Sequence, residues 1–274
     1  MAAIPSIIRR HPVPGYFALT FAISWGGVLA VIGGWPHATG VQAQDHPLFG
    51  LAVLAMLAGP SIAGLLLTAA LEGRRGWRDL AGRLLRRPVD PRWYAAALVA
   101  PVVSLAATGL LATGLGTSGP GLLTAENPAG VLALAVVVGT LAGVCEEIGW
   151  TGFVTPRLLA RHGVIASGLL IGVLWSAWHL VVVMWGMGGR NGAVPLGVFV
   201  TLDGLGVLPA FRVLMVLVYA RTESLGLAVL VHASLTVTAI ALTPPVAGTP
   251  LLVHGVLVAA LVWILVTAAT RARQ

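Results

Sequence analysis

The feature that most constrains the fold is a series of about eight apolar segments, each long enough to cross a bilayer as a helix of about 20 residues. The segments lie near residues 14–34, 49–71, 93–115, 130–152, 164–186, 195–219, 225–243 and 250–270. A helix pairs its backbone N–H and C=O groups internally, whereas irregular chain in hydrocarbon would leave these groups without hydrogen bonds. The sequence therefore predicts an all-α fold, a polytopic bundle of transmembrane helices.

The composition agrees with this prediction and leaves little chain for anything else. Hydrophobic residues make up 58% of the 274 residues and charged residues only 9%. A soluble domain has too little interior to hide such an apolar share. We therefore predict a single integral-membrane domain over residues 1–274, located in the cell membrane as a multi-pass protein, with no separate soluble domain.

The arginines predict the orientation of the spans. All 16 basic residues are arginine, and cytoplasmic loops of membrane proteins are enriched in basic residues. Seven lie between residues 74 and 92, others lie beside both termini, and only Arg190 falls in a loop predicted to be outside. This distribution predicts cytoplasmic N- and C-termini. Because these arginines are expected to face the lipid headgroups and to orient the spans, they account for the basic net charge. No nucleic-acid partner is therefore expected.

The arginine-rich loop has a helical pattern of its own. Leu80, Leu84 and Leu85 are expected on one side of a short helix with Trp77 near them, and arginines surround the rest. Such a helix is typical of the interface with an anionic leaflet. It could serve as an anchor or take part in substrate capture.

Ionisable residues inside the spans are the candidates for chemistry. Glu146 and Glu147 end the apolar segment at 130–152, and His179 and His232 lie within two others. Intramembrane ionisable groups usually face the bundle interior and act in chemistry or transport. Adjacent helix residues point about 100° apart, so one glutamate can face a partner as a base while the other orients a neighbour. The alternatives are a solvated carboxylate pair and histidines that only join helices.

Arg212 is a further ionisable group at membrane depth. It lies nine residues before Arg221, or about 13 Å along a helix, and Glu146 and His232 have similar estimated depths. An arginine buried there needs a carboxylate, so we predict an ion pair with Glu146 or Glu147. Binding of a substrate carboxylate and extension along its own helix to the surface are the alternatives.

Three short motifs in this region resemble those of the CAAX-protease and bacteriocin-processing family, also called the Abi family of intramembrane proteases. That family carries EExxxR, an aromatic residue four positions before a histidine, and HxxxN, on three helices. The corresponding residues here are Glu146, Glu147 and Thr151, then Trp175 and His179, then His232 and Thr236. The motif core covers residues 130–243, and the arginine and asparagine of the family motifs are both threonine in this chain.

The resemblance implies an intramembrane endopeptidase in which Glu146 and His179 activate a water molecule. His232 would stabilise the oxyanion, with Thr236 supplying a single hydroxyl in place of the family asparagine. Thr151 cannot replace the missing cation, and Arg212 is the candidate to do so. We therefore predict a catalytic set of Glu146, Glu147, His179, His232, Thr236 and Arg212.

The resemblance leaves the cofactor and the exact substrate open. Glu146, His179 and His232 could be three zinc ligands, although HExxH is absent, and metal-free activation of water is equally compatible. The implied partner is a prenylated or membrane-associated peptide or membrane protein. The oligomeric state is not predicted.

Two other functions compete with proteolysis. A non-catalytic membrane factor of the same fold, for bacteriocin self-immunity or a chaperone-like role, is favoured by the threonines at 151 and 236. A transporter or proton relay is disfavoured because the ionisable groups cluster at one depth. His254, in the last apolar segment, is expected to be structural.

Overall fold

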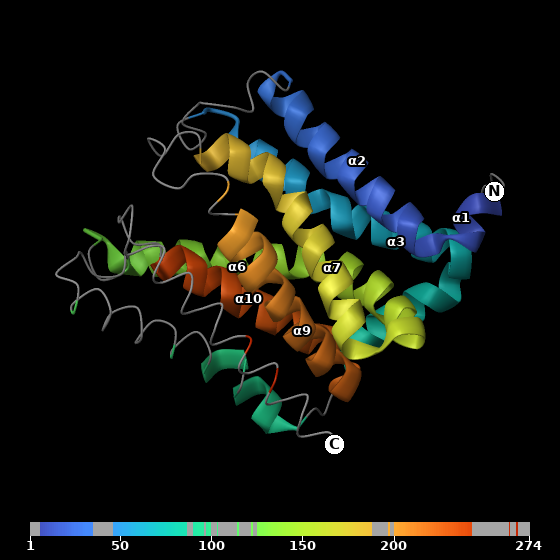
Figure 1. The fold of residues 1–274 in the computed structure, drawn as a ribbon. Coiled ribbons are helices and arrows are strands. Elements are labelled where there is room, and N and C mark those ends of the chain that lie inside the picture. Colours follow the sequence, from blue (N-terminus) through green and yellow to red (C-terminus); the bar gives the residue numbers. More distant parts are fainter. Residues whose placement is uncertain are drawn as a thin grey trace.

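The computed structural model describes residues 6–34, 46–86, 90–95, 97–99, 125–187 and 200–242, together with a few isolated positions. Within these ranges the regular secondary structure is entirely helical, which confirms the all-α prediction. The elements, labelled as in Figure 1, are α1 (Ser6–Arg10), α2 (Pro12–Ile32), α3 (Phe49–Leu84), α6 (Pro128–Gly149), η3 (Trp150–Val154), α7 (Thr155–Met187), η4 (Val200–Val207), α9 (Leu208–Thr222) and α10 (Leu225–Leu242).

Four helical stretches in the described part of the chain are long and apolar enough to cross a membrane. They are Pro12–Ile32, Phe49–Leu84, Pro128–Val181 and Val200–Thr222, and Leu225–Ala241 is a shorter apolar helix. Pro128–Val181 runs through two of the predicted spans. The spans predicted at 93–115 and 250–270 lie mostly outside the described residues, as do Arg190 and His254. The count of eight spans and their orientation therefore stay predictions.

Most of the helices pack in pairs. Figure 1 shows α2 and α3 side by side along one edge, and α10 beside α6. Helix α6 contacts α3 on one side and α10 on another, and so joins these two pairs. Helix α7 packs on α9. Glycines permit the close approaches: a Cβ added at Gly143 of α6 would lie 2.7 Å from the Val229 carbonyl oxygen of α10. Small residues of this kind replace the hydrophobic effect as the basis of packing between membrane helices.

The α7–α9 contact gives a direct test of this packing. We expect Gly168→Ala to lower the thermal unfolding midpoint of the protein in detergent, because its Cβ would lie 2.5 Å from the Val213 Cα. Overpacking of this kind costs about 1–3 kcal/mol. Gly26→Ala is the matched control, since its added Cβ would meet no atom within 4 Å. Equal midpoints for the two variants would contradict the packing.

Two long helices bend at glycines whose backbone is left-handed. Gly73 in α3 has φ 60° and Gly163 in α7 has φ 69°, a conformation that residues with a Cβ rarely adopt. The bend at Gly73 separates the apolar part of α3 from its arginine-rich end, residues 74–84, which we call the basic helix.

The basic helix is amphipathic, but the predicted leucine face is only partly correct. Leu80 is buried, whereas Leu84 is exposed and Leu85 is 74% exposed. Trp77 is also exposed, on a surface that includes Arg74, Arg75 and Arg78. The reason is that Leu80 packs against the protein at Gly152, where an added Cβ would lie 2.7 Å from Leu80 Cδ1. The inner side of the basic helix therefore contacts the protein.

Candidate active site

The two glutamates lie immediately before a change in helix type. α6 ends at Gly149, and η3, a π-helical turn over Trp150–Val154, connects it to α7. The backbone N–H of Trp150 is directed at the backbone carbonyls of both Glu146 and Glu147. The Thr155 hydroxyl donates to the Trp150 backbone carbonyl at 2.9 Å. Single π turns within helices occur frequently at functional sites. This one sets the position of Thr151 relative to the glutamates.

Glu147 is completely enclosed by polar partners from three segments. The Arg212 Nη1 atom of α9 lies 2.8 Å from Oε1 and 2.9 Å from Oε2. His232 Nδ1 of α10 lies 2.6 Å from Oε1, and the Thr151 hydroxyl donates to Oε2. The Glu147 side chain is 0% exposed and that of Arg212 is 1% exposed. The ion pair predicted for Arg212 is therefore present, and Glu147 is its carboxylate.

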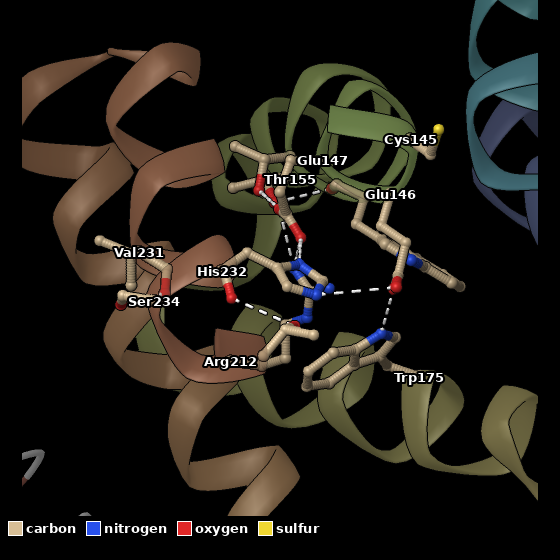
Figure 2. A network of polar contacts seen from close by, with 12 residues as sticks. Cys145, Glu146, Glu147, Thr155, Trp175, Arg212, Val231, His232 and Ser234 are labelled. Atoms are coloured by element: carbon tan, nitrogen blue, oxygen red, sulfur yellow. Dashed lines mark hydrogen bonds and ion pairs between the residues drawn. The ribbon is translucent and has the colours of Figure 1, made fainter. Parts of the chain in front are cut away.

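Glu146 has a different environment. Its Oε2 accepts a hydrogen bond of 2.7 Å from the Trp175 indole N–H of α7. Its Oε1 lies 3.6 Å from His232 Nε2, which is too long for a direct hydrogen bond. Figure 2 shows the His232 ring between the two glutamates, with one ring nitrogen toward each. Of the four carboxylate oxygens of Glu146 and Glu147, Glu146 Oε1 is therefore the one that can still accept a hydrogen bond from a water molecule.

His179 is held by the backbone of its own helix. Its Nδ1 lies 2.8 Å from the Trp175 carbonyl oxygen, and because a carbonyl can only accept, Nδ1 carries the hydrogen. This tautomer leaves Nε2 with a free lone pair. The ring packs edge-on against Trp175 and Trp178, with centroid distances of 5.0 and 4.8 Å, and it interacts electrostatically with Glu146.

Trp175 connects these groups, although the predicted catalytic set omits it. Its indole donates to Glu146, its carbonyl holds His179, and the Arg212 Cζ atom lies 4.1 Å from its ring centroid. A guanidinium stacked on indole gains cation–π attraction, which is larger in a desolvated site. The i, i+4 spacing of Trp175 and His179 was the sequence signal for their shared face.

Thr236 stands apart from this network. Its hydroxyl lies 3.4 Å from the His232 carbonyl oxygen of its own helix, which is a weak contact, and its side chain is half-buried. Among the described residues, the structure therefore brings together Glu146, Glu147, Thr151, Trp175, Arg212 and His232, with His179 beside Trp175 and Thr236 one turn from His232.

The donor set does not fit a three-ligand metal site. No group of three His, Cys, Asp or Glu side chains in the described ranges is arranged to hold a metal ion. The Nδ1 atoms of His179 and His232 are both engaged, by a backbone carbonyl and by Glu147, so only their Nε2 atoms are left to bind a metal ion or a water molecule. Glu146, His179 and His232, the set that could have supplied three zinc ligands, are not arranged as a zinc site in the described part of the chain.

The bundle and its buried polar network define a class of helical membrane protein with a site enclosed between α6, α7, α9 and α10. A family model described as type II CAAX prenyl endopeptidase Rce1-like matches residues 128–238, which include every member of this network. CAAX prenyl protease 2 of Methanococcus maripaludis is 38% identical over 39 residues, an alignment that covers 14% of this chain and 14% of the relative. The predicted resemblance is confirmed at the level of this match, which makes residues 128–238 similar to the Rce1-like CAAX prenyl endopeptidases.

Proposed function

We propose that the protein is an intramembrane endopeptidase that hydrolyses a peptide bond of a prenylated or membrane-associated substrate. The observation that carries this proposal is the unequal environment of two adjacent glutamates. The hydrogen bonds and ion pairs of the Glu147 carboxylate tie it to Arg212, His232 and Thr151, whereas Glu146 keeps one oxygen open toward His232. The Rce1-like match of the motif core supports the same reaction class.

In the proposed first step, Glu146 Oε1 and His179 Nε2 hold a water molecule. Glu146 takes one proton of this water as its oxygen attacks the substrate carbonyl carbon, forming a C–O bond and a tetrahedral oxyanion. The hydrogen bond from Trp175 holds the other carboxylate oxygen, so the base does not rotate away from the water. Exclusion of bulk water strengthens these electrostatic interactions.

In the second step, the oxyanion is stabilised and the peptide C–N bond breaks. Protonated His232 donates to the oxyanion from Nε2, because its Nδ1 already donates to Glu147. The long Thr236 contact leaves that hydroxyl able to turn and add a second donor. Glu146 then transfers its proton to the leaving amine, and the products are a carboxylic acid and an amine.

Glu147 and Arg212 act on this reaction through His232. Paired with the guanidinium, Glu147 stays ionised and accepts from His232 Nδ1, which fixes the direction of the imidazole. The arginine thus supplies, from α9, the cation that the family motif places at position 151. Thr151 keeps only a hydrogen bond to the same carboxylate.

The second candidate function is a non-catalytic membrane factor of the same fold. It is favoured by the threonines at positions 151 and 236, and Thr236 bonds its own helix instead of the Glu–Arg–His network. A buried salt bridge alone is also compatible with a purely structural role.

Purified protein in proteoliposomes separates the two functions. We expect it to cleave a farnesylated peptide carrying a fluorophore and quencher on either side of the scissile bond, and to cleave the unprenylated peptide more slowly. Terminal-peptide proteomics of membranes with wild-type protein or Glu146→Ala identifies natural substrates. If no prenylated or membrane peptide is cleaved and the two proteomes match, the scaffold function is correct.

A further inference from the structure

The basic helix of α3 reaches the active-site turn through one arginine. Arg83 Nη1 donates to the Gly152 carbonyl oxygen of η3 and to the Tyr219 hydroxyl oxygen of α9, each at 2.9 Å. Its Nη2 lies 2.9 Å from Asp79 Oδ2, one turn earlier in the same helix. The Arg83 side chain is only 14% exposed. An arginine expected to face an anionic leaflet therefore lies instead against two other elements of the bundle, η3 and α9.

The two elements that Arg83 joins are those that supply partners to Glu147. η3 carries Thr151, which directly precedes Gly152 and donates to Glu147. α9 carries Arg212, seven residues before Tyr219 and therefore two turns away on the same buried face. A fixed distance between Gly152 and Tyr219 thus restrains the distance between Thr151 and Arg212.

From these contacts we propose that Arg83 is a positioning residue, which holds the π turn and α9 in the register that lets Thr151 and Arg212 share Glu147. This inference rests on the proposed protease function for its catalytic consequence, but the restraint itself does not. The guanidinium suits the task because its planar fork serves several acceptors in fixed directions, whereas an ammonium is a single point charge.

The packing around Arg83 supports this role. Leu80 packs directly on Gly152, since a Cβ added at Gly152 would lie 2.7 Å from Leu80 Cδ1 and Leu80 would have to move to admit it. Leu80 and Arg83, one turn apart on the basic helix, therefore contact the same residue of η3. Tyr219 is 5% exposed, so its hydroxyl needs a protein partner and finds Arg83.

The test compares Arg83→Gln, Arg83→Lys and Tyr219→Phe with the control Arg78→Gln, an exposed arginine of the same helix. We expect Arg83→Gln to lower kcat by about 10²-fold with KM changed less than about 2-fold, because small misplacements of catalytic groups have such effects. Arg83→Lys should recover part of the loss, Tyr219→Phe should lose less, and the control should match wild type.

A readout independent of catalysis is the ¹⁹F NMR spectrum of protein labelled with 5-fluorotryptophan. Trp150 is 0% exposed and lies in η3, and its resonance can be assigned by its absence from a Trp150→Phe variant. We expect this resonance to shift or broaden in Arg83→Gln and Tyr219→Phe, and to stay unchanged in Arg78→Gln. An unchanged Trp150 signal in folded Arg83→Gln and Tyr219→Phe overturns the proposal. If the signal moves but wild-type protein cleaves nothing, the positioning role stands and the protease function fails.

Discussion

Glu146→Gln is expected to lower kcat for peptide cleavage by about 10³-fold or more while the protein stays folded. The amide cannot take a proton from water, yet its carbonyl oxygen can still accept the 2.7 Å hydrogen bond from Trp175. The Glu147, Arg212 and His232 contacts do not depend on Glu146, so the unfolding midpoint should change little. The measurement is steady-state cleavage of the farnesylated peptide in proteoliposomes.

Two comparisons make this prediction specific. Glu126→Gln makes the same chemical change at an exposed carboxylate just before α6 and should leave activity unchanged. His179→Ala should lose activity to a similar extent, and the double variant with Glu146→Gln should be little worse than either alone, because both groups act on one water. A Glu146→Gln enzyme that cleaves at the wild-type rate would rule out the proposed base.

Arg212→Leu is expected to destabilise the protein by about 3–5 kcal/mol and to abolish activity, because it leaves a buried carboxylate without its cation. Glu147 is 0% exposed, so water cannot replace the guanidinium. The variant also removes the group stacked 4.1 Å from the Trp175 ring centroid. Thermal unfolding in detergent and peptide cleavage are the two measurements. Arg221→Leu, at an exposed arginine of the same helix, is the control for loss of charge.

Second-site changes identify the cause of that loss. Thr151→Arg added to Arg212→Leu should restore part of both stability and activity, since Thr151 already reaches Glu147 from one helical turn away. Glu147→Gln added to Arg212→Leu should restore stability only, because it removes the unpaired charge but replaces the carboxylate that orients His232 with a neutral amide. If Arg212→Leu unfolds like wild type, or if neither second change has an effect, the ion pair does not have the proposed role.

The sequence by itself determined the class of structure and the groups available for chemistry. Apolar segments of bilayer length can only become helices in hydrocarbon, so the all-α fold followed from segment length alone. Depth along a helix follows from its constant rise, which is why Arg212, Glu146 and His232 were expected at one level. In the structure Arg212 and His232 both contact Glu147, the neighbour of Glu146. The order of the three motifs indicated the resemblance that the Rce1-like match over residues 128–238 supports.

Only the tertiary structure decided which of the ionisable side chains contact one another. Rise per residue gives the depth of a side chain but not the rotation of its helix or the identity of its neighbour. The sequence therefore left Glu146 and Glu147 equivalent as partners of Arg212, whereas the π turn and the approach of α9 assign the arginine to Glu147. The same limit hid Arg83: its spacing indicated a helix facing lipid, and only the bend at Gly73 and the packing of Leu80 on Gly152 turn it inward.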